Sequence, residues 1–270
     1  APFPSGAAVL QIEESQQRLS RNYALTAGMV GGLVPTLTLL ADTVRKNATA
    51  DFRQAAQARC QRLSSLKLEE ALALRDRLEN AQNRRAMPMA FAMATIADAI
   101  PRDAVVVEEA ITGSPDLTRI FKFAGPGDYF CGRGGGIGQG LAGALGVQLA
   151  IPDRPLVCIS GDGSAMYSIT ALWTAAHHNL PIVFIILANR EYRILKHNVD
   201  IYRQRFGIES NRAYAHLDLQ EPELGFVEMA AGMGVAGRRV SEPEELISAI
   251  DDAFAANAPR LIEVAIEAKS

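Results

Sequence analysis

The residues best suited by type and spacing to bind a ligand form a short glycine-rich segment around an acid, Gly161-Asp162-Gly163-Ser164. The segment directly follows an apolar run, Leu156 to Ser160, which is typical of a strand buried in a parallel sheet. A helix that starts directly after it would place free N–H groups beside the acid. The carboxylate would repel a phosphate unless a hard cation lay between them, and Mg2+ commonly bridges the two. The segment therefore predicts a site for Mg2+ and a phosphate group.

A second oxygen ligand is predicted at the end of the next apolar run, Ile182 to Ala188, where Asn189 follows. If a helix over Ala165 to His178 joins the two runs, they are neighbouring parallel strands whose carboxyl ends lie at one edge of the sheet. Asn189 would then reach the same ion as Asp162. For a single asparagine after a strand, an ordinary turn is the alternative interpretation.

Another glycine-rich stretch, Cys131 to Gly140, precedes an expected helix. Gly138, Gly140 and Gly143 have the G-x-G-x-x-G spacing of a dinucleotide fingerprint, but the residues before them, 125–130, are interpreted as a loop rather than the strand that a fingerprint requires. The stretch predicts either ligand binding by exposed backbone or a tight loop with close helix packing.

Alternating helices and apolar runs must position these residues. The expected strands are 104–107, 156–160, 182–188 and 261–266, and the expected helices are 89–99, 140–150, 165–178 and 243–256. The last helix begins with a possible capping box of Ser241 and Glu244. Because the apolar runs are mostly continuous, the fold class predicted for residues 88–270 is α/β, a doubly wound parallel sheet covered by helices on both faces.

The preceding residues predict a different organisation. Residues 1–45 offer one short strand near residues 8–12 and one helix over 33–44, too few partners for a stable sheet. They are interpreted as the C-terminal remnant of a central α/β domain that begins on another polypeptide. Residues 46–87 are charged and lack Gly, which favours exposed helices that link two domains.

The composition restricts the classes of function. Hydrophobic residues make up 49% of the chain and the formal net charge is -3, so a sizeable core is expected and no nucleic-acid or membrane partner is indicated. Three cysteines without metal-binding spacing favour neither disulfides nor a structural metal. A soluble cytoplasmic protein is expected.

Gly161-Asp162-Gly163 with Asn189 one strand-helix-strand unit later resembles the diphosphate-binding motif of the thiamine-diphosphate-dependent enzymes. The stretch from Tyr129 to Ala176 is most similar to benzoylformate decarboxylases and their acetolactate-synthase-like relatives. The resemblance covers nearly all of residues 88–270 and, more loosely, 1–45. It implies thiamine diphosphate and Mg2+ as cofactors and the non-oxidative decarboxylation of a benzoylformate-like 2-keto acid. The alternatives are an acetolactate-synthase-like carboligase, a non-catalytic diphosphate-binding scaffold and, last, a nicotinamide-dependent oxidoreductase.

The resemblance also implies roles for individual residues. Mg2+ would be bound by the side chains of Asp162 and Asn189 and by the backbone carbonyl of Glu191. The carbonyl of Gly135 would accept a hydrogen bond from the aminopyrimidine, and Ile137 would force the cofactor into its bent shape. The other implied cofactor contacts are Thr112, Ser114, Gly136, Gly161, Gly163, Ser164 and Tyr192. The implied substrate-pocket residues are Phe130, Cys131, Ile194 and Leu195.

The sequence departs from the family pattern in two respects. Ala188-Asn189 stands where the family usually has two asparagines, which leaves the expected ligand in place. Arg190 and Arg193 occupy positions that are often small, so they either make the pocket mouth cationic and suited to an acidic substrate or are ordinary loop charges in solvent.

The family's activating glutamate lies in a separate pyrimidine-binding domain, which no region of this sequence resembles. None of the four histidines matches the active-site histidines of the decarboxylases. No catalytic residue is therefore expected on this chain, and a second polypeptide is expected to supply the pyrimidine-binding domain. A cofactor shared between two domain types further predicts a homo-oligomer, a dimer or tetramer of complete units.

Overall fold

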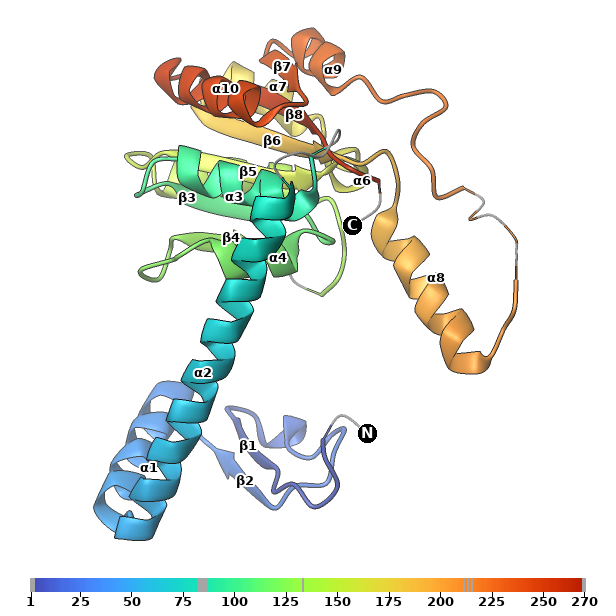
Figure 1. Cartoon of the computed structure of the whole chain (residues 1–270). Coiled ribbons are helices and arrows are strands. Elements are labelled where there is room, and N and C mark those ends of the chain that lie inside the picture. The colour runs from blue at the N-terminus through green and yellow to red at the C-terminus, as the bar shows by residue number, and fades with distance from the viewer. Residues whose placement is uncertain are drawn as a thin grey trace. The chain divides into compact units, whose positions relative to one another are not determined.

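The computed structural model describes residues 3–81, 87–132, 134–210, 212, 214 and 216–268. The chain divides into two compact units, Ala1–Ala73 and Leu74–Ser270 (Figure 1). The boundary falls within one long helix, α2 (Ala50–Ala81). The division into a domain remnant, a linker and a diphosphate-binding domain stays a prediction.

The first unit contains little regular structure besides its helices. Two short strands, β1 (Leu10–Glu13) and β2 (Ala27–Val30), pair in parallel, with the 3-10 helix η1 (Gln16–Arg18) between them. Helix α1 (Leu33–Asn47) follows, so the strand and the helix expected here are both present. None of the described residues in 3–73 is buried. This unit therefore has no core of its own among these residues.

The second unit is built on one parallel sheet of six strands in the order β4-β3-β5-β6-β8-β7 (Figure 1). The strands are β3 (Val105–Glu109), β4 (Tyr129–Cys131), β5 (Leu156–Gly161), β6 (Ile182–Ala188), β7 (Ala236–Val240) and β8 (Arg260–Ala265). The helices are α3 (Met89–Ala99), α4 (Ser114–Ile120), α5 (Gly140–Ala150), α6 (Asp162–Ala165), α7 (Ala171–His177), α8 (Arg193–Phe206), α9 (Phe226–Gly232) and α10 (Pro243–Ala255).

Helices cover both faces of the sheet, and the central strands contribute side chains to a hydrophobic core on each face. In β6, Val183, Ile185 and Leu187 pack in a cluster with residues of α3 and α10. Alternate residues Phe184 and Ile186 pack in a second cluster with residues of α5, α7 and α9. Since successive side chains of a strand point to opposite faces, both faces of β6 must be apolar, which explains its continuous apolar run. The predicted doubly wound α/β fold is confirmed.

The strand order identifies where such a sheet binds ligands. The chain leaves β3 toward β4 at one edge and then returns, so β5, β6 and the later strands lie on the other side of β3. The direction of winding thus reverses between β3 and β5. Open α/β sheets bind ligands outside the carboxyl ends of the strands at this reversal.

One expected helix is interrupted. The continuous helix expected over 165–178 is divided into α6 and α7. Between them the backbone makes turns closed by hydrogen bonds between residues three apart. Ser168 N–H donates to the carbonyl of Ala165, and Ala171 N–H donates to that of Ser168. Tight turns of this kind replace α-helical bonds without changing the apolar pattern, so the sequence pattern does not show the break.

Two local predictions are wrong. Residues 129 and 130, interpreted as part of a loop, belong to the edge strand β4, which is too short to show a two-residue period. The capping box of α10 consists of Glu242 and Glu245 instead of Ser241 and Glu244. Pro243 takes the first helical position, which moves the cap one residue along. In the described part of the chain, no helix is long and apolar enough to cross a membrane.

Candidate functional site

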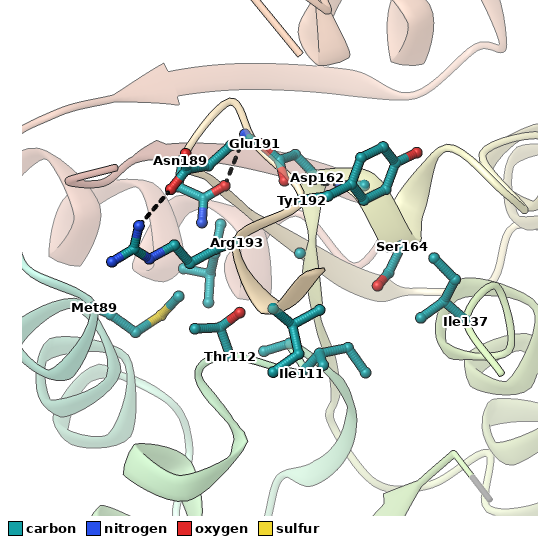
Figure 2. Close-up of a pocket in the computed structure, with 15 residues that line it drawn as sticks. Met89, Ile111, Thr112, Ile137, Asp162, Ser164, Asn189, Glu191, Tyr192 and Arg193 are labelled. Atoms are coloured by element: carbon teal, nitrogen blue, oxygen red, sulfur yellow. Dashed lines mark hydrogen bonds and ion pairs between the residues drawn. The ribbon is translucent and has the colours of Figure 1, made fainter. Parts of the chain in front are cut away.

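A hollow lies at the carboxyl edge of the sheet, where the winding reverses. Its lining comes from the segments after β3, β5 and β6, together with Met89 at the start of α3 and Ile137 from the glycine-rich loop (Figure 2). It encloses about 420 Å³ of empty space, part of which is open to solvent. The lining residues are Met89, Ala110, Ile111, Thr112, Ile137, Gly161, Asp162, Gly163, Ser164, Leu187, Asn189, Glu191, Tyr192, Arg193 and Ile194.

Asp162 is the acid at the centre of this lining. Its side chain accepts hydrogen bonds from the backbone N–H groups of Gly163 (2.8 Å) and Arg190 (2.7 Å). Burial raises the pKa of Asp162 to about 6, against the lowering effect of these two bonds. Among the described residues no cationic side chain forms an ion pair with it. A carboxylate that is only 3% exposed and lacks a counter-ion fits a site for a cation.

Asn189 and Glu191 bring two more oxygens to the same loop. Because β5 and β6 are adjacent parallel strands, with Gly161 opposite Leu187, Asp162 and Asn189 follow neighbouring strand ends, as the sequence predicted. The Asn189 side chain accepts a hydrogen bond from Glu191 N–H at 3.1 Å. Within the described chain no hydrogen bond reaches the Glu191 carbonyl oxygen, which leaves it available as a ligand.

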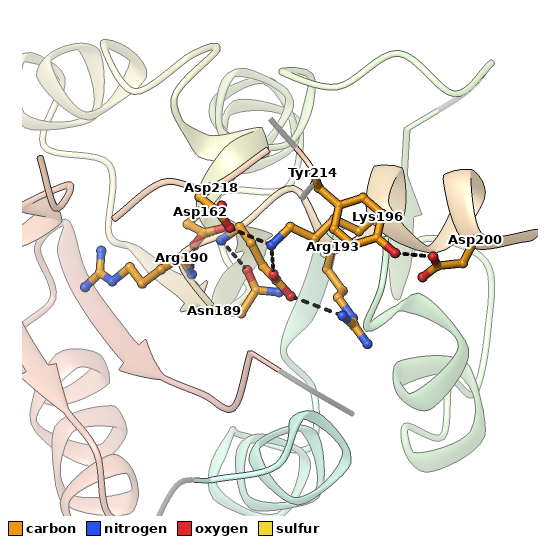
Figure 3. Close-up of polar contacts among 9 residues, drawn as sticks. Asp162, Asn189, Arg190, Arg193, Lys196, Asp200, Tyr214 and Asp218 are labelled. Carbon is orange, nitrogen blue, oxygen red and sulfur yellow. Dashed lines mark hydrogen bonds and ion pairs between the residues drawn. The ribbon is translucent and has the colours of Figure 1, made fainter. Parts of the chain in front are cut away.

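The segment 217–219, here called the strap, pairs with residues 190–192 of this loop and holds it in place (Figure 3). Tyr192 N–H donates to the carbonyl of Leu217 at 2.8 Å, and Leu219 N–H donates to the carbonyl of Arg190 at 2.8 Å. Lys196, in α8, donates to the carboxylate of Glu191 and, at 2.5 Å, to that of Asp218. The Glu191 side chain is thus used in the scaffold, which agrees with a ligand role for its backbone carbonyl only.

The donor set suits a hard cation. One carboxylate, one amide oxygen and one free carbonyl are all oxygen ligands, the type that Mg2+ prefers. No group of three His, Cys, Asp or Glu side chains that could hold a metal occurs in the described residues, and the set above contains only one such ligand side chain. These residues therefore fit Mg2+ better than zinc, which is bound mainly by Cys and His.

The glycine-rich loop is fixed by an acid that the sequence reasoning missed. Glu109, at the end of β3, accepts hydrogen bonds from the N–H groups of Gln139 (2.9 Å) and Gly140 (3.1 Å). A Cβ at Gly140 would lie 2.8 Å from the Cβ of Glu109, so the packing of α5 against β3 requires glycine there. The sequence did contain a signal for Glu109, because two acids, Glu108 and Glu109, end an otherwise apolar run. The structure shows that both are buried.

Glu108, the other missed acid, accounts for the position of Ser114. Its carboxylate accepts hydrogen bonds from Ser114 Oγ (2.6 Å), Ala110 N–H (2.6 Å) and the Tyr129 hydroxyl (3.0 Å). Ser114 therefore lies outside the lining of the hollow, whereas Thr112 forms part of it.

The hollow gathers most of the predicted site residues but not all of them. Those in its lining are Thr112, Ile137, Gly161, Asp162, Gly163, Ser164, Asn189, Glu191, Tyr192 and Ile194. Those outside it are Ser114, Phe130, Cys131, Gly135, Gly136 and Leu195. Phe130 and Cys131 are exposed on β4, and Leu195 is exposed on α8. Their predicted roles stay predictions.

The idea that Arg190 makes the pocket mouth cationic is wrong. Its guanidinium donates to the Leu224 carbonyl (2.7 Å) and pairs with Glu263 of β8 and with Glu223 (2.8 Å). The backbone of Arg190 has a φ of 62°, in the left-handed region, and Arg190 is not among the residues that line the hollow. Arg193, by contrast, does line the hollow.

The fold and the site define an α/β domain with a hollow at the reversal of a parallel sheet, lined by the oxygen-bearing residues described above. Residues 112–264 match the family model described as the C-terminal TPP-binding domain of thiamine pyrophosphate enzymes. The chain therefore belongs to this family of thiamine-diphosphate-dependent enzymes, which includes decarboxylases and acetolactate synthases.

Similar proteins support the same family. The chain is 40% identical over 170 residues to a putative acetolactate synthase large subunit of Mycobacterium tuberculosis, covering 62% of this chain and 32% of the relative. It is 42% identical over 164 residues to a benzoylformate decarboxylase of Pseudomonas aeruginosa, covering 61% of this chain and 29% of the relative. The aligned part thus spans about a third of these curated relatives.

A solved structure shows the same architecture over almost the whole chain. The thiamine-diphosphate-dependent 4-hydroxybenzoylformate decarboxylase of Rhodococcus jostii superposes with a TM-score of 0.76 at 28% identity. The match covers 98% of this chain and 45% of that protein.

Proposed function

We propose that this chain is the diphosphate-binding part of an enzyme that decarboxylates a benzoylformate-like 2-keto acid without oxidation. Its role is to bind Mg2+ and the diphosphate of thiamine diphosphate. The observation that carries the proposal is the convergence of Asp162, Asn189 and the free carbonyl of Glu191 in one hollow beside Gly163 and Ser164. When bound, the cofactor supplies the electron sink for cleavage of the bond to the carboxylate.

The roles of the residues follow from their positions. Asp162, Asn189 and the Glu191 carbonyl hold the cation, and the N–H groups and hydroxyls of the segments after β3 and β5 face the diphosphate. Ile137 and Gly135 act on the pyrimidine side of the cofactor. The activating glutamate is assigned to a pyrimidine-binding domain on a second polypeptide, and denaturing mass spectrometry of the isolated assembly tests whether such a companion is present.

Calorimetric titration of the chain with Mg2+ and thiamine diphosphate tests the binding role. We expect Mg2+-dependent binding, and at least about a 100-fold loss of affinity in Asp162→Asn, because even groups that only support a metal ligand contribute 10- to 100-fold. Asp153→Asn, in an exposed loop, is the matched control and should bind like the unmodified chain. Binding that is equal with and without Mg2+ would contradict the proposed site.

Carboligation is the second candidate, because one of the similar proteins is a putative acetolactate synthase large subunit. The two reactions differ in whether a proton or a second keto acid captures the product of decarboxylation. The assembly with its pyrimidine-binding half should convert benzoylformate to aldehyde and CO2. If the assembly forms acetolactate from pyruvate and no aldehyde, the proposed function is carboligation instead of decarboxylation to an aldehyde.

A further inference from the structure

Two arginines in the loop after β6 differ in how their charges are used. The guanidinium of Arg190 is bonded to two carboxylates and a carbonyl, which satisfies it within the scaffold. Arg193 begins α8, and its side chain lies among the site residues with Asn189 and Thr112 (Figure 2). The contrast identifies Arg193 as the arginine that a ligand can reach.

Arg193 has little of its hydrogen-bonding capacity in use. Within the described chain its one ion pair joins Nη1 to Oε1 of Glu191 at 3.5 Å. The other oxygen of Glu191 is already bonded to Lys196. A guanidinium carries five N–H donors in a planar fork that matches phosphate oxygens. The side chain is 28% exposed, so most of it is removed from the water that would otherwise satisfy these donors.

The surroundings of Arg193 favour an anion on one side of it. A smaller adjoining hollow shares Arg193, Asn189 and Thr112 with the first, but two carboxylates also line it, Glu267 and Asp116, of which Asp116 is paired with Arg77 at 2.6 Å. An anion bound there would lie beside both carboxylates, which disfavour it. On the side of the first hollow, two carboxylates occur in the lining formed by the described residues. The proposed cation would neutralise Asp162, and Lys196 neutralises Glu191.

We propose that Arg193 binds the diphosphate of the cofactor as a second cation beside Mg2+. This inference rests on the proposed function and adds a residue of this chain to the same site. Because arginine can bind two phosphate oxygens at once, it would fix the orientation of the diphosphate as well as add affinity. The alternative anion in reach is the carboxylate of an acidic substrate, which the experiment separates.

The test is a titration of the full chain with Mg2+ and inorganic pyrophosphate, a probe that requires only this half of the site. We expect Arg193→Ala to bind about 10- to 100-fold more weakly, the effect of losing hydrogen bonds to a charged group. Arg193→Lys should recover part of the affinity, because it keeps the charge but not the fork. The control is Arg205→Ala, at an exposed arginine of the same helix that stacks on Phe206, and it should change the affinity for pyrophosphate less than twofold.

Further titrations separate the possible outcomes. Thiamine without phosphate should bind the Arg193→Ala variant and the unmodified chain equally. If the unmodified chain binds Mg2+ and pyrophosphate and Arg193→Ala binds them equally well, the inference is wrong while the proposed function stands. If only the binding of a dicarboxylic keto acid is weakened, Arg193 recognises substrate instead. If the unmodified chain binds neither pyrophosphate nor thiamine diphosphate, the proposed function fails first. Circular dichroism and melting of each variant confirm that it is folded.

Discussion

Gly163 leaves the space that the Tyr192 ring occupies beside the proposed cation ligands. A Cβ at this position would lie 2.5 Å from Cε1 and 2.8 Å from Cδ1 of the Tyr192 ring, so the ring and its loop would have to move. We expect Gly163→Ala to destabilise the protein by about 1–3 kcal/mol, as overpacking does, and to weaken Mg2+-dependent binding of thiamine diphosphate. Urea unfolding and calorimetric titration measure the two effects.

The matched control is Gly146→Ala in α5, where a Cβ would meet no atom within 4 Å. Alanine in the interior of a helix is favoured over glycine, so this variant should be more stable by about 0.5–1 kcal/mol and should bind normally. Equal destabilisation by both substitutions would mean that the contact with Tyr192 is not the cause.

Asp128 makes the free energy of unfolding depend on pH in the acidic range. Hydrogen bonds from Gly125 N–H (2.8 Å) and from Arg154 (2.9 Å) hold the pKa of this carboxyl group below its usual value. A carboxyl group with a lower pKa in the folded state adds stability above its unfolded pKa and loses it as the pH falls through its folded pKa. Asp128→Asn should therefore lower the urea midpoint at pH 7 and change it little at a pH below both the usual pKa of about 3.9 and the lower pKa of the folded state. An equal loss at both pH values would point to a steric cause.

At the scale of elements, Lys196 ties α8 to the loop and the strap around the site (Figure 3). Burial by itself would lower the pKa of Lys196, but its bonds to Asp218 and Glu191 raise it, so it stays charged at neutral pH. Its removal leaves the buried carboxylate of Glu191 with only the longer ion pair to Arg193, at 3.5 Å, among the described residues. We expect Lys196→Met to cost about 3 kcal/mol and to speed hydrogen exchange in residues 190–192 and 217–219.

A double variant separates the scaffold role of Glu191 from its proposed ligand role. In Glu191→Gln with Lys196→Met, the buried charge of Glu191 is removed together with the lysine, and the remaining partner, Asp218, is 59% exposed to water. Stability should therefore recover in part. Because the proposed ligand is the backbone carbonyl, Mg2+ binding should persist in Glu191→Gln. A loss of Mg2+ binding in a folded Glu191→Gln variant would mean that the side chain is itself a ligand.

At the scale of the whole molecule, the two units differ in what they contribute to stability. The described side chains of residues 3–73 are all at least partly exposed, and the two core clusters belong to the second unit. Since burial of apolar surface dominates folding free energy, residues 74–270 should fold alone with a midpoint within a few degrees of that of the full chain. Thermal unfolding of both forms measures this, and a fragment that fails to unfold cooperatively would contradict it.

The sequence by itself determined the parallel sheet, because apolar runs such as Ile182–Ala188 have no polar face to leave in water. It also determined that Asp162 and Asn189 would lie at the same edge of the sheet, since both follow strands that one crossover joins and that pair side by side. These predictions depend on local composition and on the known handedness of such units. The same reasoning located the expected helices α3 and α5 at their observed bounds.

Only the tertiary structure decided which charges face the site. Arg190 and Arg193 are equally cationic in the sequence, but carboxylates from β8 and from the loop before α9, far away along the chain, bind the first and leave the second in the hollow. The same holds for Glu109, whose partners lie thirty residues later at the start of α5. Partners brought together by folding decide these roles, and a local sequence pattern does not contain them.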